Sequence, residues 1–419
     1  MKCETTCVEV IARMFVSRVM QSKNSLAVLL WVLVCVNSSQ AAEIQSAPDQ
    51  ASKATSSRPL ASVLPPAKWQ EVEDAVDHAL AWMAKQQAED GSFPTLAQGQ
   101  PGVTSFATMA FLSRGHQPGQ GPYGQRMNRA IDYVLSCQLS NGLISLRPPG
   151  PMHADKQPSH TAIYNHAISG LMLGEVYGQV SGPRAKTVKQ GIERALQFSH
   201  ELQMRPKRPI DKGGWRYLRL NSSRVDSDLS VTGWHIMFMR SAKNGQFNVP
   251  QADLDESLAY VRRLWNPTSG VFSYDTQDQV GTMAMDTRGM VGAGILCLSL
   301  GGQHQTPMAR AAGDWLLAHP VRRFGDLISS RDRFFYGAYY CSQAMVQLGG
   351  RYWEQYFPSL VNALLSGQQS DGSWPPEVDR GGNGVGGGGS EAMFGNVYSS
   401  ALAVLSLTPP YQLLPVYQR

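Results

Sequence analysis

Three histidines lie beside aromatic residues in two stretches of the chain. His160 and His166 flank Tyr164 in the segment HTAIYNH, and His235 follows Trp234 in TGWH. Histidine titrates near neutral pH, so each imidazole could act as an acid or a base on a bound ligand that the neighbouring aromatic rings contact. The competing interpretation is that each histidine makes hydrogen bonds inside a core or at its rim. The sequence leaves both interpretations open.

Two aspartates, Asp226 and Asp228, stand directly before a segment with helical character. The start of a helix carries unpaired backbone N–H groups and a partial positive charge, so it favours anions and acidic side chains. The two carboxyl groups are therefore candidates for a catalytic acid pair. Aspartate is also one of the preferred N-cap residues, so Asp228 could instead serve only to cap the helix.

Further candidates stand at the start of later apolar segments. Asp286 precedes one of them, and three tyrosines, Tyr336, Tyr339 and Tyr340, gather at the start of the next. These tyrosines could line a ligand cavity, and core filling by aromatic rings is the alternative. Because all of these residues stand near helix starts, the arrangement of the helices decides whether they meet.

A two-helix pattern recurs from residue 69 onward with a period of roughly 50–60 residues, near that of helical repeat arrays. The first stretch of each copy is amphipathic: Ala79 and Met83 lie on one side of the first copy, and Asp77 and Lys85 lie on the other. The second stretch, such as GMVGAGILCLSLGG, has no polar face and must be buried on every side. Six such copies predict an all-α double ring, an (α/α)6 toroid, in which the last copy closes on the first and the starts of the inner helices converge at one mouth.

Composition supports a folded chain without a nucleic-acid partner. The 419 residues are 42% hydrophobic and 16% charged, the formal net charge is only +5, and basic residues form no dense run. The six cysteines contain no CxxC pair, so a disulfide framework or a zinc ribbon is not expected.

The N-terminal segment is predicted to be an export signal. Residues 25–36 form an apolar run that basic residues precede, and small residues before residue 42 fit cleavage. We expect a signal peptide at 1–41, a flexible linker at 42–68, the toroid at 69–410 and a C-terminal tail at 411–419. The protein would then reside in the periplasm or cell envelope. An uncleaved membrane anchor is the alternative, and either Met1 or Met20 could be the first residue.

The turns between the paired helices resemble the QW repeats of squalene and oxidosqualene cyclases, which also occur in degraded form in protein prenyltransferase beta subunits. Gln369, Gly372 and Trp374 fit the Q-x-x-G-x-W spacing, and looser matches are Gln87, Gly91 and Phe93 in the first copy and Gly214 and Trp215 in the third. The order of the segments is most similar to exported squalene-cyclase-like proteins of bacteria. This resemblance, over residues 69–407, implies an (α/α)6 toroid.

The resemblance also implies chemistry. Squalene–hopene cyclases carry a D-x-D-D motif whose aspartate protonates an alkene, whereas here Leu229 and Ser230 follow Asp228. Their cavity aromatics stabilise carbocations through π faces, which is the role implied for Tyr336, Tyr339 and Tyr340. The prenyltransferase subunits bind zinc through an aspartate, a cysteine and a histidine. The matching residue types are Asp286, Cys341 and His166, but their spacing differs, so we predict neither a metal nor another cofactor.

Two functions follow. The first is an exported protein that binds or transforms an apolar, isoprenoid-like small molecule in a central cavity, with Asp226, Asp228 and His166 as candidate catalytic residues. The second is a non-catalytic scaffold that binds a protein or a glycan. A deep apolar pocket would favour the first function, and side chains that fill the ring would favour the second. Contact with a membrane is expected only through the N-terminal segment.

Overall fold

The computed structural model describes residues 59–147, 156–218, 225–277, 287–329, 331–376 and 391–418, all within the compact unit Ser57–Arg419. Residues 1–58, with the predicted signal peptide and most of the linker, lie outside the described residues, and so does Asp286.

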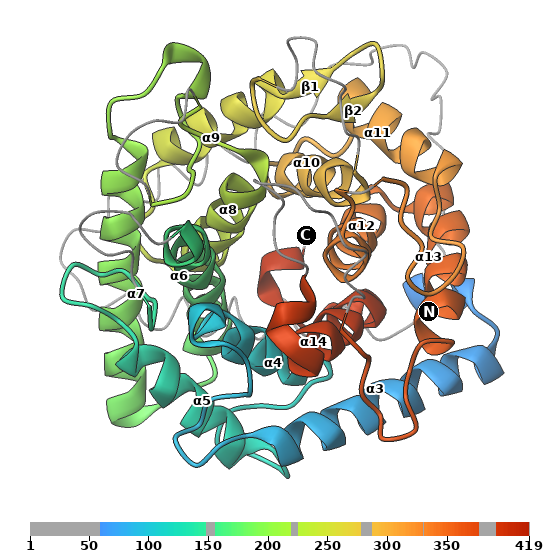
Figure 1. Ribbon diagram of the computed structural model, residues 1–419, viewed down its shortest axis with the longest axis horizontal. Coiled ribbons are helices and arrows are strands. Elements are labelled where there is room, and N and C mark those ends of the chain that lie inside the picture. Colours follow the sequence, from blue (N-terminus) through green and yellow to red (C-terminus); the bar gives the residue numbers. More distant parts are fainter. Residues whose placement is uncertain are drawn as a thin grey trace, which may run out of the picture. The chain divides into compact units, whose positions relative to one another are not determined.

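Two sets of six α-helices alternate along the described part of the chain and form two concentric rings (Figure 1). The outer ring consists of α3 (Pro66–Gln86), α5 (Gly124–Ser136), α7 (Gly182–Gln203), α9 (Gln251–Arg263), α11 (Pro307–Ala318) and α13 (Gly350–Leu365). The inner ring consists of α4 (Gly102–Ser113), α6 (Lys156–Tyr177), α8 (Leu229–Asn244), α10 (Arg288–Leu300), α12 (Phe334–Leu348) and α14 (Gly395–Leu407). Each inner helix contacts the next one, and α14 contacts α4, so the inner ring is closed.

Short elements complete the fold. The described 3-10 helices are η1 (Leu60–Val63), η2 (Ala97–Gly99), η3 (Pro209–Asp211), η4 (Glu391–Phe394), η5 (Pro409–Tyr411) and η6 (Pro415–Tyr417). A small antiparallel hairpin, β1 (Trp265–Asn266) and β2 (Val271–Phe272), joins α9 to the residues before α10.

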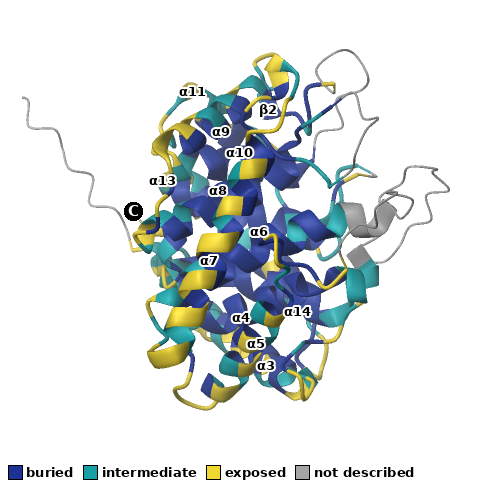
Figure 2. Cartoon of the chain, turned by 90° about the vertical axis from the view of Figure 1, so that its left-hand side faces the viewer, coloured by how far each residue is buried: buried dark blue, intermediate teal, exposed yellow. Residues whose placement is uncertain are grey.

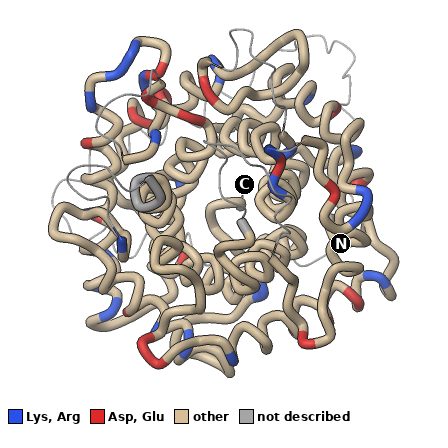
Figure 3. The backbone as a smooth tube through the Cα atoms, viewed as in Figure 1, with Lys and Arg blue, Asp and Glu red and all other residues tan. Residues whose placement is uncertain are grey.

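The burial pattern explains the two rings. Every residue of α4 is buried, whereas α5 buries only one stripe of its surface (Figure 2). Charged residues stand mainly on the outer helices and the connecting loops (Figure 3). A helix without a polar face is stable only inside another layer, and an amphipathic helix can supply that layer. The predicted all-α (α/α)6 toroid is thereby confirmed.

We call the segment that leads from an outer helix to the following inner helix a joint. In four copies of the repeat, a glutamine side chain stabilises the joint through hydrogen bonds. The glutamine Nε2 donates to a carbonyl of its own joint and to a backbone carbonyl of the next outer helix. The residues are Gln87, Gln138, Gln203 and Gln368. In the last copy this residue is Gln368 rather than Gln369, whose Oε1 instead accepts a hydrogen bond from the Ser373 hydroxyl.

Joint glycines allow the joint to touch the neighbouring outer helix. Gly213 has a φ of +87°, and a Cβ there would lie 2.2 Å from the carbonyl oxygen of Glu256 on α9. Gly142 has a φ of +92°, and its Cβ would lie 2.3 Å from the carbonyl oxygen of Arg194 on α7. Only glycine fits a left-handed conformation with so close a backbone contact.

The last copy is sealed against the first by polar contacts. Arg114, after α4 in the first copy, donates to the hydroxyl of Tyr411, after α14, at 2.8 Å, and two hydrogen bonds of 2.8 and 2.9 Å to Asp77 on α3 of the same copy hold its guanidinium in place. Gln368 Nε2, after α13, donates to the carbonyl of Ala75 on α3 at 2.8 Å.

The ring extends beyond its predicted boundaries at both ends. η1 packs against α13, where the Trp353 indole donates to the Leu60 carbonyl at 3.0 Å, so the end of the predicted linker belongs to the ring. The predicted tail is also part of the fold, because Leu414, Val416 and Tyr417 are buried. Apolar side chains in both segments complete the core, which explains why they are ordered.

No helix in the described ranges has the length and hydropathy needed to cross a membrane. Within the same ranges Cys137, Cys297 and Cys341 are buried free thiols. Burial raises the pKa of Cys341 to about 12, so this thiol stays protonated.

Candidate functional site

His166 takes part in a joint. In three other joints, the residue two positions after the joint glycine donates its backbone N–H to a hydroxyl on the following inner helix. Trp215 N–H, for example, donates to the Thr232 hydroxyl. In the second copy Ile144 N–H donates to His166 Nδ1 at 3.2 Å, and His166 Nε2 lies 3.0 Å from the Ser199 hydroxyl. Burial lowers the pKa of His166 to about 3, so the imidazole is neutral and, because Nδ1 accepts, its proton is on Nε2. This bonding favours a positioning role, and the predicted catalytic role stays a prediction.

His235 is completely buried beneath the third joint. Its ring stacks on Trp215 with a centroid distance of 4.5 Å and an interplanar angle of 2°. Neither ring nitrogen has a hydrogen-bond partner among the described residues, and burial lowers the pKa of the imidazole. Trp215 covers one face of this buried imidazole, and the predicted ligand contact of His235 stays a prediction.

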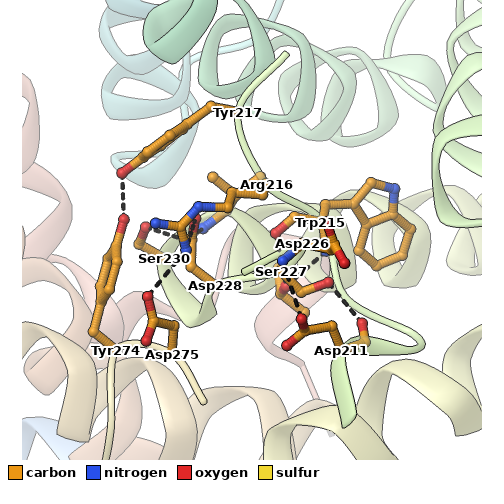
Figure 4. A network of polar contacts seen from close by, with 12 residues as sticks. Asp211, Trp215, Arg216, Tyr217, Asp226, Ser227, Asp228, Ser230, Tyr274 and Asp275 are labelled. Atoms are coloured by element: carbon orange, nitrogen blue, oxygen red, sulfur yellow. Dashed lines mark hydrogen bonds and ion pairs between the residues drawn. The ribbon is translucent and has the colours of Figure 1, made fainter. Parts of the chain in front are cut away.

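A polar cluster surrounds the start of α8, and we call it the mouth cluster (Figure 4). It combines acidic, basic, hydroxyl and phenol side chains from α6, from the third joint, from the start of α8 and from the residues after β2. Its members are Tyr164, Arg216, Tyr217, Asp228, Ser230, Tyr274 and Asp275.

Backbone hydrogen bonds hold the cluster together. Asp228 N–H donates to the Trp215 carbonyl at 3.0 Å, which places Arg216 beside Asp228. Leu229 N–H donates to the Tyr274 carbonyl at 2.8 Å, which places the residues after β2 on the other side of Asp228. The mouth cluster is therefore assembled from three copies of the repeat by contacts that a single copy could not make.

Asp228 caps α8 through one carboxyl oxygen, and the other oxygen has no hydrogen bond from a described residue. Its Oδ1 accepts hydrogen bonds from Val231 N–H at 2.9 Å and from the Ser230 hydroxyl at 2.6 Å, so the N-cap interpretation is confirmed. Its Oδ2 has no hydrogen-bond partner and lies 3.7 Å from Arg216 Nη1. Complete burial raises the pKa of Asp228, and the nearby guanidinium opposes this shift.

Arg216 links the acids to the phenols. Its Nη1 lies 3.1 Å from Asp275 Oδ2, and its guanidinium carbon lies 5.3 Å and 5.7 Å from the ring centroids of Tyr217 and Tyr274. The hydroxyls of these two tyrosines are hydrogen-bonded to each other. Burial raises the pKa of Tyr217 to about 12, so its phenol stays protonated at neutral pH.

Tyr164 and His160 lie at the α6 side of the mouth cluster. The Tyr164 hydroxyl is 2.5 Å from the Ser230 hydroxyl, and burial raises the pKa of the phenol well above its ordinary value. The His160 ring lies 4.0 Å from the Tyr217 ring. The structure therefore brings these two predicted residues to the same place as Asp228.

Asp226 has other partners. Its Oδ2 accepts from Arg208 N–H at 3.1 Å, and its own N–H donates to Asp211 Oδ2 at 3.1 Å. In Figure 4 Asp226 lies on the Asp211 side and Asp228 on the Arg216 side of the segment. The structure does not bring their carboxyl groups together as a pair, because each is engaged by a different element.

The predicted aromatic candidates pack the inside of the ring. Trp234 and Tyr339 stack with a centroid distance of 5.4 Å, and Tyr340 meets both rings edge-on. The ring of Tyr336 lies 4.8 Å from that of Tyr340. From the other side of the ring, Phe106 contacts Trp234 at 5.3 Å. Trp234, Tyr339 and Tyr340 are almost completely buried, so these rings fill much of the interior of the ring.

Sequence reasoning missed Arg216, Tyr217, Tyr274 and Asp275. The sequence does contain a pattern that could have identified them. In the segments GWRY and VFSYD, each tyrosine stands two positions after the aromatic residue of its joint. Aligning the six copies on the joint aromatic would have placed these residues next to the starts of inner helices. In the described parts of the chain no group of three or more His, Cys, Asp or Glu residues could hold a metal ion.

No protein-family model matches the chain, and no curated protein matches its sequence. Solved structures do match. A variant of the type II terpene cyclase MstE from Scytonema, in complex with geranylgeranyl dihydroxybenzoate, is 15% identical with a TM-score of 0.54, over 84% of this chain and 100% of that one. A protein from Actinoplanes is 16% identical with a TM-score of 0.52, over 81% and 99%.

A family 76 glycoside hydrolase from a bovine Bacteroides thetaiotaomicron strain is 11% identical with a TM-score of 0.55, over 82% of this chain and 78% of that one. At these identities the likeness shows a shared α/α toroid fold. One fold can carry unrelated activities, so the function has to be argued from the site.

Proposed function

We propose that the mouth cluster binds a polyhydroxylated ligand of glycan type, with Asp228 as the hydrogen-bonding and proton-donating acid of the site. The observation that carries this proposal is Oδ2 of the completely buried Asp228, which forms an ion pair with Arg216 Nη1 at 3.7 Å but has no hydrogen-bond partner among the described residues. A buried carboxyl oxygen that lacks a hydrogen bond is costly, and a hydroxyl-bearing ligand would supply one.

The side chains around Asp228 suit such a ligand. Arg216 and the phenol hydroxyls donate hydrogen bonds, and the carboxyl oxygens accept them. The tyrosine rings add flat apolar surfaces against which the C–H faces of a sugar could pack. The Arg216 side chain is 19% exposed, so the mouth cluster can be approached from one side.

The raised pKa of Asp228 decides which acid chemistry suits it. The carboxyl group keeps its proton to a higher pH, which suits transfer to a ligand oxygen. The same shift makes it a weaker acid, whereas an alkene is a very poor base and needs a strong acid. Asp228 is therefore better matched to a hydroxylated ligand than to cyclisation of an isoprenoid.

The second candidate is an apolar, isoprenoid-like ligand in the ring. The aromatic interior and the fold shared with a terpene cyclase favour it. The packing of Trp234, Tyr339 and Tyr340 against one another leaves less room for a long apolar chain, so we rank this candidate second.

Two further points belong to the proposal. The joints would be QW-type repeats. The contacts of Gln87 and Gln368 support this, because each Nε2 donates to the carbonyl of its joint glycine and to a backbone carbonyl of the neighbouring outer helix. The protein would be exported, which the apolar run at residues 25–36 supports. An exported protein has access to envelope glycans.

The test is a glycan-array screen of the full-length protein, followed by titration of any hit with purified variants. We expect Asp228→Asn to weaken binding about tenfold or more, because asparagine can keep the helix cap but does not reproduce the acid. Tyr217→Phe, which removes one hydroxyl, should weaken binding less, by roughly 1 kcal/mol.

Arg184→Ala is the matched control, because Arg184 forms an exposed ion pair with Asp132 on the outer ring. This variant should bind like the original protein. Native mass spectrometry of the protein from its own cell envelope tests the other candidate. A co-purified isoprenoid lipid, combined with no glycan binding, would reject the proposal and support the second candidate.

A further inference from the structure

A cleft lies toward the other end of the inner ring from the mouth cluster. It has a volume of about 400 Å³ and is enclosed by the C-terminal halves of α8 and α10, by α9 and by the C-terminal segment at Val416–Gln418. Arg240 on α8 contributes to its wall, twelve residues after Asp228. At 1.5 Å per residue the two backbones are about 18 Å apart along the helix, so the cleft is separate from the mouth cluster.

The inner wall of the cleft is apolar. Ile236, Leu254, Leu258 and Val416 are buried residues that line it, and the half-buried Leu300 completes this surface. Leu254 and Leu258 stand four residues apart on α9 and therefore share one face of that helix. An apolar wall of this kind favours a ligand with a hydrocarbon part, because such a ligand removes the remaining apolar surface of the cleft, mainly that of Leu300, from water.

The rim of the cleft is basic. Arg240 makes no ion pair or hydrogen bond with the residues that the structure describes, although it is half-buried beside the cleft. Lys243, one turn later on the same face of α8, donates only to the neutral amide of Gln251. Asp255 is the acid of the rim and accepts a hydrogen bond from Gln251, and His304 lies at the α10 side.

We propose that this cleft binds a small anionic amphiphile, whose carboxylate or phosphate head pairs with Arg240 and Lys243 and whose unbranched chain lies along Leu254, Leu258 and Leu300. A guanidinium without a partner offers parallel N–H donors to either head group. The volume lies within the range of small-molecule sites. The backbone carbonyls at the ends of α8 and α10 disfavour an anion, so its binding depends on these two side chains.

Isothermal titration calorimetry of the full-length protein tests the ligand class. The probes are dodecanoate and dodecyl phosphate below their micellar concentrations, with acetate, inorganic phosphate and dodecyltrimethylammonium as comparisons. We expect one molecule of dodecanoate or dodecyl phosphate to bind per chain, and the better of the two identifies the head group. Head groups alone should bind at least tenfold more weakly. Equal binding of the cationic amphiphile or of the head groups alone would overturn the proposal.

Variants locate the site. Arg240→Ala should weaken binding of the anionic amphiphiles at least tenfold, and Ser299→Trp, which places a large ring in the cleft, should abolish it. Arg310→Ala is the control, because Arg310 lies on α11 away from the cleft and bonds Gln305. Circular dichroism melting identifies any variant that fails to fold. Unchanged binding in folded Arg240→Ala or Ser299→Trp would overturn the proposal.

Discussion

Replacing Trp374 by alanine will lower the free energy of unfolding by about 3–5 kcal/mol, as for other large aromatic side chains in protein cores. Trp374 is completely buried in the last joint. Its indole N–H donates to the Leu364 carbonyl at 2.7 Å, and its backbone N–H donates to the Ser400 hydroxyl at 2.8 Å. Alanine keeps the backbone bond but leaves a cavity where α13 meets α14, and the Leu364 carbonyl is left with its backbone partner, Gly367 N–H.

The position of this joint enlarges the expected effect. Gln368, in the same joint, holds the Ala75 carbonyl of α3, so the joint lies where the last copy meets the first. A cavity there weakens the closure of the ring as well as one helix pair. Chemical denaturation followed by circular dichroism gives the change in unfolding free energy, with the slope of the transition as a check on cooperativity.

Trp315→Ala is the comparison variant. Trp315 is half-buried on the outer helix α11 and stacks on His319, so its removal opens less core. We expect Trp315→Ala to lower the free energy of unfolding by less than half as much as Trp374→Ala does. A loss below about 1 kcal/mol for Trp374→Ala, within the range of surface changes, would mean that the last joint is not packed as described.

The double ring could be predicted because its cause is local. A helix such as α4, with no polar face, must be buried on all sides, and an amphipathic helix such as α5 must cover something. This contrast is visible in any single copy of the sequence. Six repetitions of the pair then leave few arrangements that bury every apolar face, and a closed ring is one of them.

The mouth cluster could be predicted only in part, because its contacts join separate copies. Asp228 was a candidate from its place at a helix start, and the same place explains its role as a cap. Arg216 and Asp275 are 59 residues apart in sequence and meet across two joints. Their partnership depends on how Trp215 and Tyr274 pair with the start of α8, and a periodic pattern does not encode such pairing.

The separation of Asp226 from Asp228 has a similar cause. The two residues share an extended segment, and spacing alone suggested a pair of acids. The backbone N–H of Arg208 and the carboxyl group of Asp211, from the residues after α7, bind Asp226 instead. Local spacing thus limits which residues can meet, and the neighbouring elements decide which of them do.

Glu175 will make the protein less stable as the pH rises from about 4.5 to about 7. This residue of α6 is only 2% exposed, and burial raises its pKa from the ordinary value of 4.5 to about 7. Between these values the folded chain keeps a proton that the unfolded chain releases, so the folded state loses stability as the pH increases. Above about pH 7 the loss from this group reaches about 3 kcal/mol, since one pKa unit corresponds to about 1.4 kcal/mol.

Glu175→Gln removes this titration and keeps the shape of the side chain. Glu175 accepts hydrogen bonds from the Ser241 hydroxyl and from Val416 N–H, and glutamine can still accept from Val416. We expect unfolding free energies at pH 5 and pH 8 to show that the variant gains on the original protein by about 2.5 kcal/mol at the higher pH, because part of the loss has already occurred at pH 5. Comparing the two proteins at each pH cancels the titration of all other groups.

Glu193→Gln is the matched control, because Glu193 is an exposed residue of the outer helix α7 that forms an ion pair with Lys189. It should leave the pH profile unchanged. If the unfolding free energy of Glu175→Gln changes with pH in the same way as that of the original protein, burial does not hold a proton on Glu175. In the expected case, ionisation of Glu175 destabilises the fold because the carboxylate is buried away from water, and the hydrogen bond from Val416 N–H offsets only part of that cost.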